Sequence, residues 1–398
     1  MYGLPLSVKV CKKCLMTNQK PFSVNESDNS KNKKKIGLSF DKEGVCDACL
    51  YSEEKKKINW HQREKLLIQM LDKYRSSNEN YDCIVSGSGG KDSMFQAHIL
   101  KYKYNMNPLT VTYSPILYTD VGRRNMNSWI YKGGFDNYLF TPNGRVLSVL
   151  CKESFKNFLH PIQPFKIGIK TFAVKMALKL SIKLVIYGEP YAEYGSDNDS
   201  SSSIPNYPID WLGSDKKFEE HYISGITIAE LRKKYNFLSQ NDLYPYVPSQ
   251  LDEIKKSNIR VDYLGWYLNW DPQQIFYYAA ENSGFEIDDF RTNSTYGRYS
   301  GIDDKFESLH FYCQYIKFGI GRCRFDVSQE IRSGHLTRKE GVNLCKKYEN
   351  EFPDRYIDDC LNFLNIEREE ADQIFDTFRP KHLWEKKINK WKLKQNMY

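Results

Sequence analysis

The segment Ser86-Gly-Ser-Gly-Gly-Lys-Asp-Ser93 combines the residue types that bind phosphate groups. It follows Tyr81–Val85, a mostly apolar segment that predicts a buried strand, and precedes Met94–Leu100, which predicts the start of a helix. A glycine-rich turn between a strand and a helix presents several backbone N–H groups at the positive end of the helix. The glycines also lack the Cβ atoms that would keep an anion away from the backbone. We therefore expect an ATP site at this turn.

The spacing of this loop excludes the two common nucleotide motifs, since neither G-x-x-x-x-G-K-[ST] nor G-x-G-x-x-G is present. The string S-G-G-K-D-S resembles the PP-loop of the ATP pyrophosphatases, which cut ATP between the α- and β-phosphates. An ordinary tight βα turn is the alternative. Lys91 and Asp92 are candidate catalytic residues, with Asp92 helping to hold Mg²⁺. Pyrophosphate and AMP contacts are expected from Ser86, Ser88, Gly89, Gly90, Asp92 and Ser93.

Two C-x-x-C pairs lie near the N-terminus: Cys11 with Cys14, and Cys46 with Cys49. Each pair can bind one metal ion through two thiolates, and together they supply the tetrahedral sulfur shell that structural Zn²⁺ favours. Four thiolates could also hold an iron–sulfur cluster, although the paired spacing favours zinc, and four unrelated reduced cysteines are the third alternative. We expect a structural zinc ribbon.

From Tyr81 onward, strand and helix patterns alternate, which is typical of a parallel α/β sheet. Ligands of such sheets bind beyond the carboxyl ends of the strands. Thr112 and Tyr113 end the second expected strand, so they are candidate nucleotide contacts. Gly188 and Glu189 follow a later strand, Lys183–Tyr187, where a carboxylate next to bound phosphates could hold Mg²⁺ or act in catalysis. Residues 196–203 are of low complexity and predict a mobile loop or a lid.

The composition narrows the class of protein. The chain has 398 residues, enough for two or three domains, and no apolar run approaches the roughly 20 residues that span a bilayer. No signal peptide is evident, so we expect a soluble cytoplasmic protein that does not bind membranes, in which ten cysteines indicate metal binding or catalysis rather than disulfides. The net charge of +8 is concentrated in short lysine clusters, which are more typical of solvated faces than of a nucleic-acid site.

Beyond about residue 250 the strand pattern fades and aromatic-rich helices are expected. We predict a zinc ribbon at 1–60, an ATP-binding α/β domain with a linker helix at 61–250, and a helical substrate or partner domain at 251–398. A charged helix follows Lys317-Phe-Gly-Ile-Gly-Arg322, and a surface ladder of ion pairs would explain its composition equally well. Lys317, Arg322 and Arg332 are candidate contacts for an anionic sugar or phosphate.

The cysteine pairs, the loop, Gly188-Glu189, Tyr263-Leu-Gly-Trp266 and the segment Lys317–Arg322 occur in an order that resembles the N-acetyl sugar amidotransferase family. The resemblance runs from Cys11 to Trp391 and departs at Pro190, where the family usually has Asn. It implies that ATP activates the oxygen of a sugar acetamido group as an adenylated imidate, and that ammonia then displaces AMP to leave an acetamidino group. The sugar would be free or nucleotide-linked, in the synthesis of a bacterial surface glycan or flagellin glycan.

The same resemblance implies partner proteins that deliver ammonia, a HisH-like glutaminase and a HisF-like cyclase subunit, because no glutaminase domain is recognisable in this chain. The chain alone would then use ammonium but not glutamine efficiently.

Two other classes of function remain open from the sequence. A tRNA-thiolating PP-loop enzyme also joins cysteine pairs to such a loop, and usually needs a reactive cysteine near ATP. Cys83 is expected in the core, which leaves Cys151 as the candidate. The second class is a zinc-ribbon adaptor protein that catalyses no reaction. This class does not explain the presence of Glu189 after a strand or of the charged helix.

Overall fold

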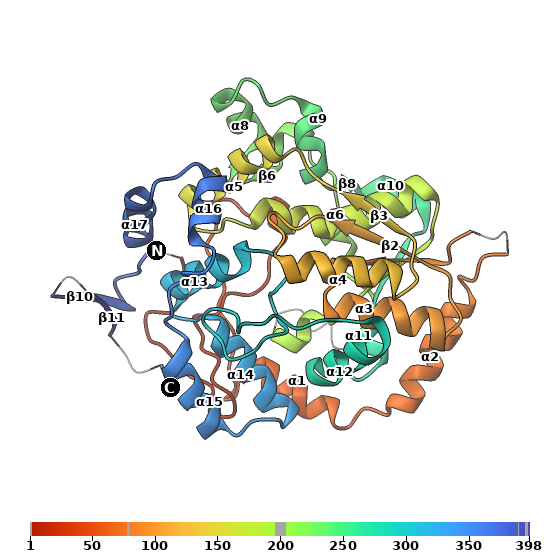
Figure 1. The fold of residues 1–398 in the computed structure, drawn as a ribbon, viewed down its shortest axis with the longest axis horizontal. Coiled ribbons are helices and arrows are strands. Elements are labelled where there is room, and N and C mark those ends of the chain that lie inside the picture. Colours follow the sequence, from red (N-terminus) through yellow and green to blue (C-terminus); the bar gives the residue numbers. More distant parts are fainter. Residues whose placement is uncertain (1, 78–79, 196–203, 389, 395–396) are drawn as a thin grey trace.

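In the computed structural model, which describes residues 2–77, 80–195, 204–388, 390–394 and 397–398, a parallel sheet forms the centre of the protein (Figure 1). The expected low-complexity loop at 196–203 lies outside the described residues. The sheet has five strands in the order β3-β2-β1-β4-β9, and every neighbouring pair is parallel. The strands are β1 (Cys83–Ser86), β2 (Pro108–Tyr113), β3 (Asn137–Phe140), β4 (Leu184–Tyr187) and β9 (Arg260–Tyr263).

The order of the strands fixes where a ligand can bind. From β1 the chain moves outward through β2 to β3, and then returns to place β4 on the other side of β1. The connections therefore diverge between β1 and β4, and the crevice beyond the carboxyl ends of these strands is the usual ligand site of an open parallel sheet. The segment 86–93 follows β1, and Gly188 and Glu189 follow β4, so both expected patches lie at this crevice.

Helices cover both faces of the sheet (Figure 1). On one side α6 (Gln163–Leu180) packs on β1, β2 and β4. Pro164 favours the start of this helix, because the N–H groups of the first turn have no partner within the helix. On the other side lie α3 (Lys91–His98), which continues into a π-helical turn (Ile99–Lys103), and α4 (Asp120–Tyr131). Nearby elements are α5 (Gly144–Phe158), α8 (Ile228–Lys234), α9 (Gln240–Leu243), α10 (Leu251–Ser257), α11 (Leu264–Tyr267) and α12 (Pro272–Ser283), with short strands β5 (Gly213–Ser214), β6 (Tyr222–Ile223), β7 (Ile226–Thr227) and β8 (Ser249–Gln250).

The expected α/β class with a helical C-terminal region is confirmed, but the expected loss of strands after residue 250 is wrong. β9 lies beyond that point and completes the sheet next to β4. The domain division at residue 250 stays a prediction, and it separates β9 from the sheet to which it belongs. The later elements are α13 (Phe306–Phe318), α14 (Arg322–Ser333), α15 (Arg338–Tyr348), α16 (Ile357–Leu364), α17 (Arg368–Thr377) and the hairpin β10 (Trp384–Lys387) and β11 (Lys390–Leu393).

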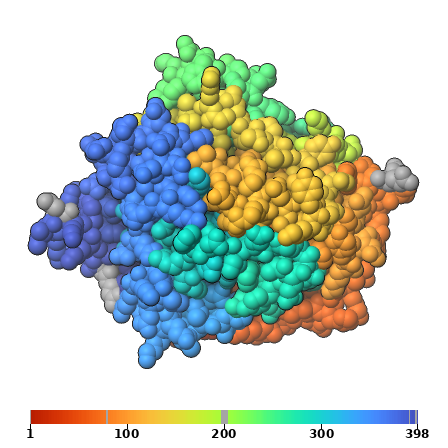
Figure 2. Space-filling model, in the orientation of Figure 1, coloured from red at the N-terminus to blue at the C-terminus, as the bar shows by residue number. Residues whose placement is uncertain are grey.

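The N-terminal segment packs on these C-terminal helices. It contains α1 (Asp47–Lys55) and leads into α2 (Trp60–Asp72). The guanidinium of Arg324, fully buried and paired with Glu349 at 2.7 Å, donates to the carbonyl of Leu15 at 2.8 Å. Arg338 donates to the carbonyl of Cys14 at 3.3 Å. In Figure 2 the C-terminal helices, in blue, adjoin residues from the middle of the chain, in teal and orange-yellow, on the face shown. Within the described part of the chain, no helix has the length and apolar character needed to cross a bilayer.

Two buried histidines between α5 and α13 should make folding sensitive to acid. The rings of His160 and His310 stack with centroids 4.8 Å apart. Burial outweighs the Glu26 carboxylate, 3.7 Å from His160, and lowers the pKa of His160 to about 4. Burial also lowers the pKa of His310 well below its usual value.

Because unfolding lets both rings take up protons, stability should fall as the pH drops below about 6.5, by about 2 kcal/mol per ring between pH 7 and pH 5. Calorimetric melting at the two pH values tests this. In His310→Phe the loss of stability between pH 7 and pH 5 should be about half of that in the wild type. In His61→Phe, which changes an exposed site, the loss should equal that of the wild type.

Candidate active site

A cavity of about 560 Å³ opens at the carboxyl edge of the sheet. One part of its wall comes from the phosphate loop, Ser86–Ser93. A second part comes from the ends of β2, β4 and β9 and from α6, and a third from residues 296–330 of the C-terminal region. Among the expected site residues, those that line the cavity are Ser86, Ser88, Gly89, Gly90, Lys91, Asp92, Ser93, Tyr113, Gly188, Glu189 and Arg322.

The phosphate loop has the geometry of an anion cradle. Gly89 has φ +84°, and a Cβ there would lie 2.8 Å from the backbone of Met126, so only glycine fits. Gly90 is the N-cap of α3, whose first N–H groups have no helical partner. Among the hydrogen bonds of the described residues, none uses the N–H of Ser88, Gly89 or Gly90. These donors are available to a phosphate group.

Two acidic groups lie together beside this cradle. Asp92 accepts from the ammonium of Lys91 at 2.7 Å, and its side chain is 41% exposed. Burial, followed by the Asp92 carboxylate, raises the pKa of Glu189 to about 7. Tyr194 holds Glu189 in place by donating its hydroxyl hydrogen at 2.6 Å. A pair of carboxylates at a phosphate cradle is a suitable donor set for Mg²⁺.

The C-terminal wall of the cavity is acidic. Arg322 pairs with Asp326 at 2.9 Å, one turn along α14, and Glu330 accepts from the hydroxyl of Tyr299 at 3.0 Å. Asp303 and Glu307 add two further carboxylates. This wall therefore offers carboxylate oxygens that can accept hydrogen bonds from hydroxyl groups of a ligand.

One hydrogen bond joins the C-terminal wall to the phosphate loop: Ser88 donates its hydroxyl hydrogen to Asp303 at 2.7 Å. The segment around Asp303 is held against α4, because a Cβ on Gly122 would lie 2.5 Å from the Asp303 carbonyl oxygen. Asp304 accepts from the backbone N–H of Ile116 at 2.6 Å and thereby ties this segment to the end of β2. The loop and the C-terminal region therefore form one site.

The sheet side of the cavity is aromatic. Tyr113 is 3% exposed and Tyr263 is 2% exposed, and neither hydroxyl has a hydrogen-bond partner among the described residues. The Tyr113 ring occupies space that a Cβ on Gly168 of α6 would fill. The rings of this wall are suited to stacking against a planar ligand.

Three expected site residues lie outside the cavity. Thr112 is fully buried, and its hydroxyl oxygen accepts from Asn137 at 3.0 Å, because alternate strand residues face opposite sides of the sheet. Lys317 donates its ammonium hydrogen to the carbonyl of Phe158 at 2.9 Å. Arg332 lines a separate pocket of about 180 Å³ and donates to the carbonyl of Glu193 at 3.2 Å.

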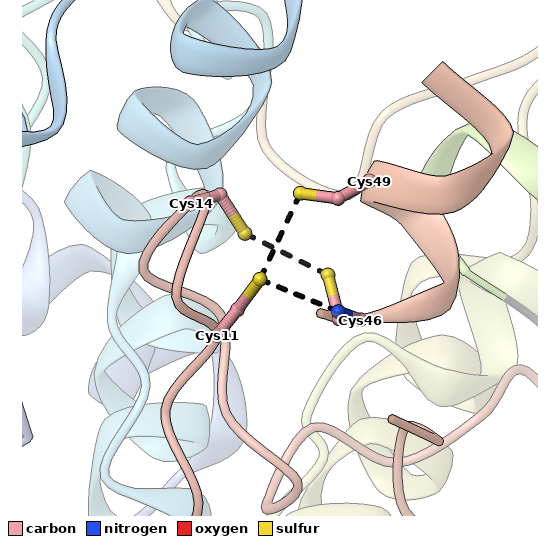
Figure 3. A group of neighbouring side chains, drawn as sticks. All are labelled: Cys11, Cys14, Cys46 and Cys49. Atoms are coloured by element: carbon pink, nitrogen blue, oxygen red, sulfur yellow. Dashed lines mark hydrogen bonds between the residues drawn. The ribbon is translucent and has the colours of Figure 1, made fainter. Parts of the chain in front are cut away.

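The four N-terminal cysteines form a buried metal-binding site, with their sulfur atoms within 4.8 Å of one another (Figure 3). The sulfurs of Cys11 and Cys49 lie 3.8 Å apart and those of Cys14 and Cys46 lie 3.7 Å apart. Zn–S bonds of about 2.3 Å in a tetrahedron place sulfurs about 3.8 Å apart, so the site fits a single zinc ion. A 4Fe-4S cluster attaches each cysteine to a different corner of a cube and needs a wider shell. The backbone N–H of Met16 and that of Cys46 donate to two of the sulfurs, as thiolate ligands require.

Several residues of the cavity were missed from the sequence. Asp326 and Glu330 belong to the charged helix, whose composition a surface ladder of ion pairs explains equally well, and Asp303 lies in the loop before α13. Lys170 and Glu307 could not be predicted as cavity residues from the sequence, because each is a single charged residue on a helix.

Residues 293–398 match the family model described as "LPS biosynthesis protein WbpG-like, C-terminal domain". The C-terminal region is thus WbpG-like, which supports the resemblance to the amidotransferase family. No curated protein matches the chain. Among solved structures, the chain is similar to the U34-tRNA thiolase NcsA from Methanococcus maripaludis with its 4Fe-4S cluster. The identity is 11%, the match covers 77% of this chain and 86% of that chain, and the TM-score is 0.29.

Proposed function

We propose, from the premise that residues 293–398 form a WbpG-like domain, that the protein is an ATP-dependent amidotransferase acting on an acetamido sugar in surface-glycan synthesis. One observation carries the proposal. The WbpG-like region and the phosphate loop line the same cavity and are joined by the hydrogen bond from Ser88 to Asp303. A site built this way brings ATP and a glycan precursor into contact.

The chemistry takes two steps. The acetamido oxygen attacks the α-phosphorus of ATP, the bond from this phosphorus to the bridging oxygen breaks, and pyrophosphate leaves. Loss of the amide proton gives an O-adenylyl imidate. Ammonia then adds to the imidate carbon, the carbon–oxygen bond breaks to release AMP, and the surplus proton goes to solvent. Adenylation is required because an amide oxygen is a poor leaving group.

The residues of the loop suit the first step. The free N–H groups of Ser88, Gly89 and Gly90 would bind the departing pyrophosphate, and Lys91 adds positive charge. Asp92 and Glu189 would hold Mg²⁺, which supplies charge neutralisation on the phosphate oxygens when bound. The aromatic wall around Tyr113 suits the adenine ring, and the acidic wall suits sugar hydroxyls.

The cysteine cluster would hold structural Zn²⁺. Its sulfur spacing matches a closed tetrahedral shell, and all four residues are buried, which leaves no open position for catalysis.

The decisive experiment incubates the purified protein with ATP, Mg²⁺, ammonium and a panel of free and nucleotide-linked acetamido sugars. We expect release of AMP and pyrophosphate and a product about 1 Da lighter by mass spectrometry, from exchange of O for NH. Ammonium should support the reaction and glutamine should not, since HisH-like and HisF-like partners would deliver ammonia. Efficient use of glutamine by the single chain would refute the partner requirement.

A tRNA-thiolating enzyme remains the second candidate, and one substitution separates it from the first. Cys151 is fully buried, does not line the cavity, and has a pKa raised well above its usual value by that burial. Such a thiol is a poor nucleophile. We therefore expect Cys151→Ser to keep ATP-dependent amidination within about threefold of the wild-type kcat, after correction for folded protein. Complete loss of activity in a folded Cys151→Ser variant would favour sulfur transfer.

A further inference from the structure

Three cationic side chains line the cavity among the described residues: Lys91, Lys170 and Arg322. Two of them are already neutralised, Lys91 by Asp92 at 2.7 Å and Arg322 by Asp326 at 2.9 Å. The ammonium of Lys170 differs, because no described side chain gives it a hydrogen bond or an ion pair. It lies 5.2 Å from the ring centroid of Tyr191 and 5.3 Å from that of Trp211.

We propose that Lys170 recognises the carboxylate of the sugar substrate, so that the enzyme selects acetamido sugars with one acidic group. The inference rests on the proposed function and replaces the expected roles of Lys317 and Arg332, which lie outside the cavity.

The surroundings of Lys170 favour a compact anion. The two rings exclude water from part of the ammonium, and a charge–charge contact strengthens where water is excluded. Glu26 interacts with Lys170 electrostatically, but its carboxylate accepts from Asn29 at 2.9 Å and faces His160 at 3.7 Å. The ammonium of Lys170 is therefore available to a ligand.

The acidic side chains of the C-terminal wall disfavour binding of an anion beside them. Asp303, Glu307 and Glu330 line it, and the carboxylate of Glu307 has no hydrogen-bond partner among the described residues. These groups would repel a carboxylate but accept hydrogen bonds from ring hydroxyls. This arrangement would orient a sugar with its hydroxyls toward residues 303–330 and its carboxylate toward Lys170.

The test compares Lys170→Met with Lys179→Met, a control at an exposed position of the same helix that does not line the cavity. Calorimetry measures binding of N-acetylneuraminic acid, which has a carboxylate, and of N-acetylmannosamine, which has none, both without ATP. We expect the wild type to prefer the acidic sugar. Lys170→Met should weaken its binding about 10–100-fold and leave binding of the neutral sugar and the KM for ATP unchanged. Lys170→Arg should restore most of the affinity.

Equal binding of the two sugars by the wild type, binding of neither, or equal losses in Lys170→Met and Lys179→Met would overturn the inference. A rise in the KM for ATP in Lys170→Met would overturn it as well, by assigning the lysine to the nucleotide. The proposed function fails by a different result: absence of AMP and pyrophosphate release with every acetamido sugar in the panel.

Discussion

Asp92→Asn is expected to lower kcat for pyrophosphate release by about 10²–10³-fold. Asparagine keeps the size of the side chain but removes the charge that we assign to Mg²⁺ binding and leaves Lys91 without its ion-pair partner. The variant should also need a higher Mg²⁺ concentration for half-maximal rate. Steady-state kinetics at several Mg²⁺ concentrations measures both effects.

The control for this prediction is Asp120→Asn. Asp120 is an exposed acidic residue in the first turn of α4 and does not line the cavity, so its loss should leave kcat within about twofold. Thermal melting of both variants separates catalysis from folding. An unchanged kcat and Mg²⁺ requirement in Asp92→Asn would show that the carboxylate has no part in ATP cleavage.

Cys49→Ser is expected to release the metal and to lower Tm by about 10 °C or more, because a structural zinc site contributes its binding free energy to folding. The effect should extend beyond the N-terminal segment, since the cysteines share a hydrophobic cluster with Phe318 and Ile320 of the C-terminal region. Calorimetry and elemental analysis for zinc and iron measure the outcome. One zinc per chain is expected in the wild type.

Cys360→Ala is the matched control, as Cys360 is also fully buried but lies in another cluster. This substitution should lower the free energy of unfolding by about 1–2 kcal/mol through lost packing, and the variant should keep the full metal content. Iron in the purified wild type, or a Cys49→Ser variant with unchanged metal content and Tm, would contradict the zinc assignment.

The features predicted correctly from the sequence are those encoded in short stretches. The phosphate loop needs only its own glycines and the adjoining strand and helix, and each C-x-x-C pair is a local chelator. The expected strands that end at Val85, Tyr113 and Tyr187 were also recognisable, because nearly all of their residues are buried between polar turns.

The features that were missed depend on contacts distant in sequence. β9 is a four-residue strand that contains Arg260 and Asp262, so its composition does not indicate a core strand. From the sequence, Lys317 and Arg322 are equally good candidates for contacts with an anionic sugar. In the structure, Gly319 ends α13 with φ +66°, and the chain turns before α14 begins. Only Arg322 faces the cavity after this turn. Lys170 becomes distinctive only when the pairing of the other two cavity cations is known.

The packing of the N-terminal segment on the C-terminal helices has a consequence during synthesis. The Leu15 carbonyl meets Arg324 only after 309 further residues have been made. At about 5–20 residues per second, this takes about 15–60 s, during which the cysteine pairs have emerged without their final packing partners. The cysteine segment is therefore buried long after its own synthesis, and early metal binding would keep its four thiols from oxidation while the following residues are translated.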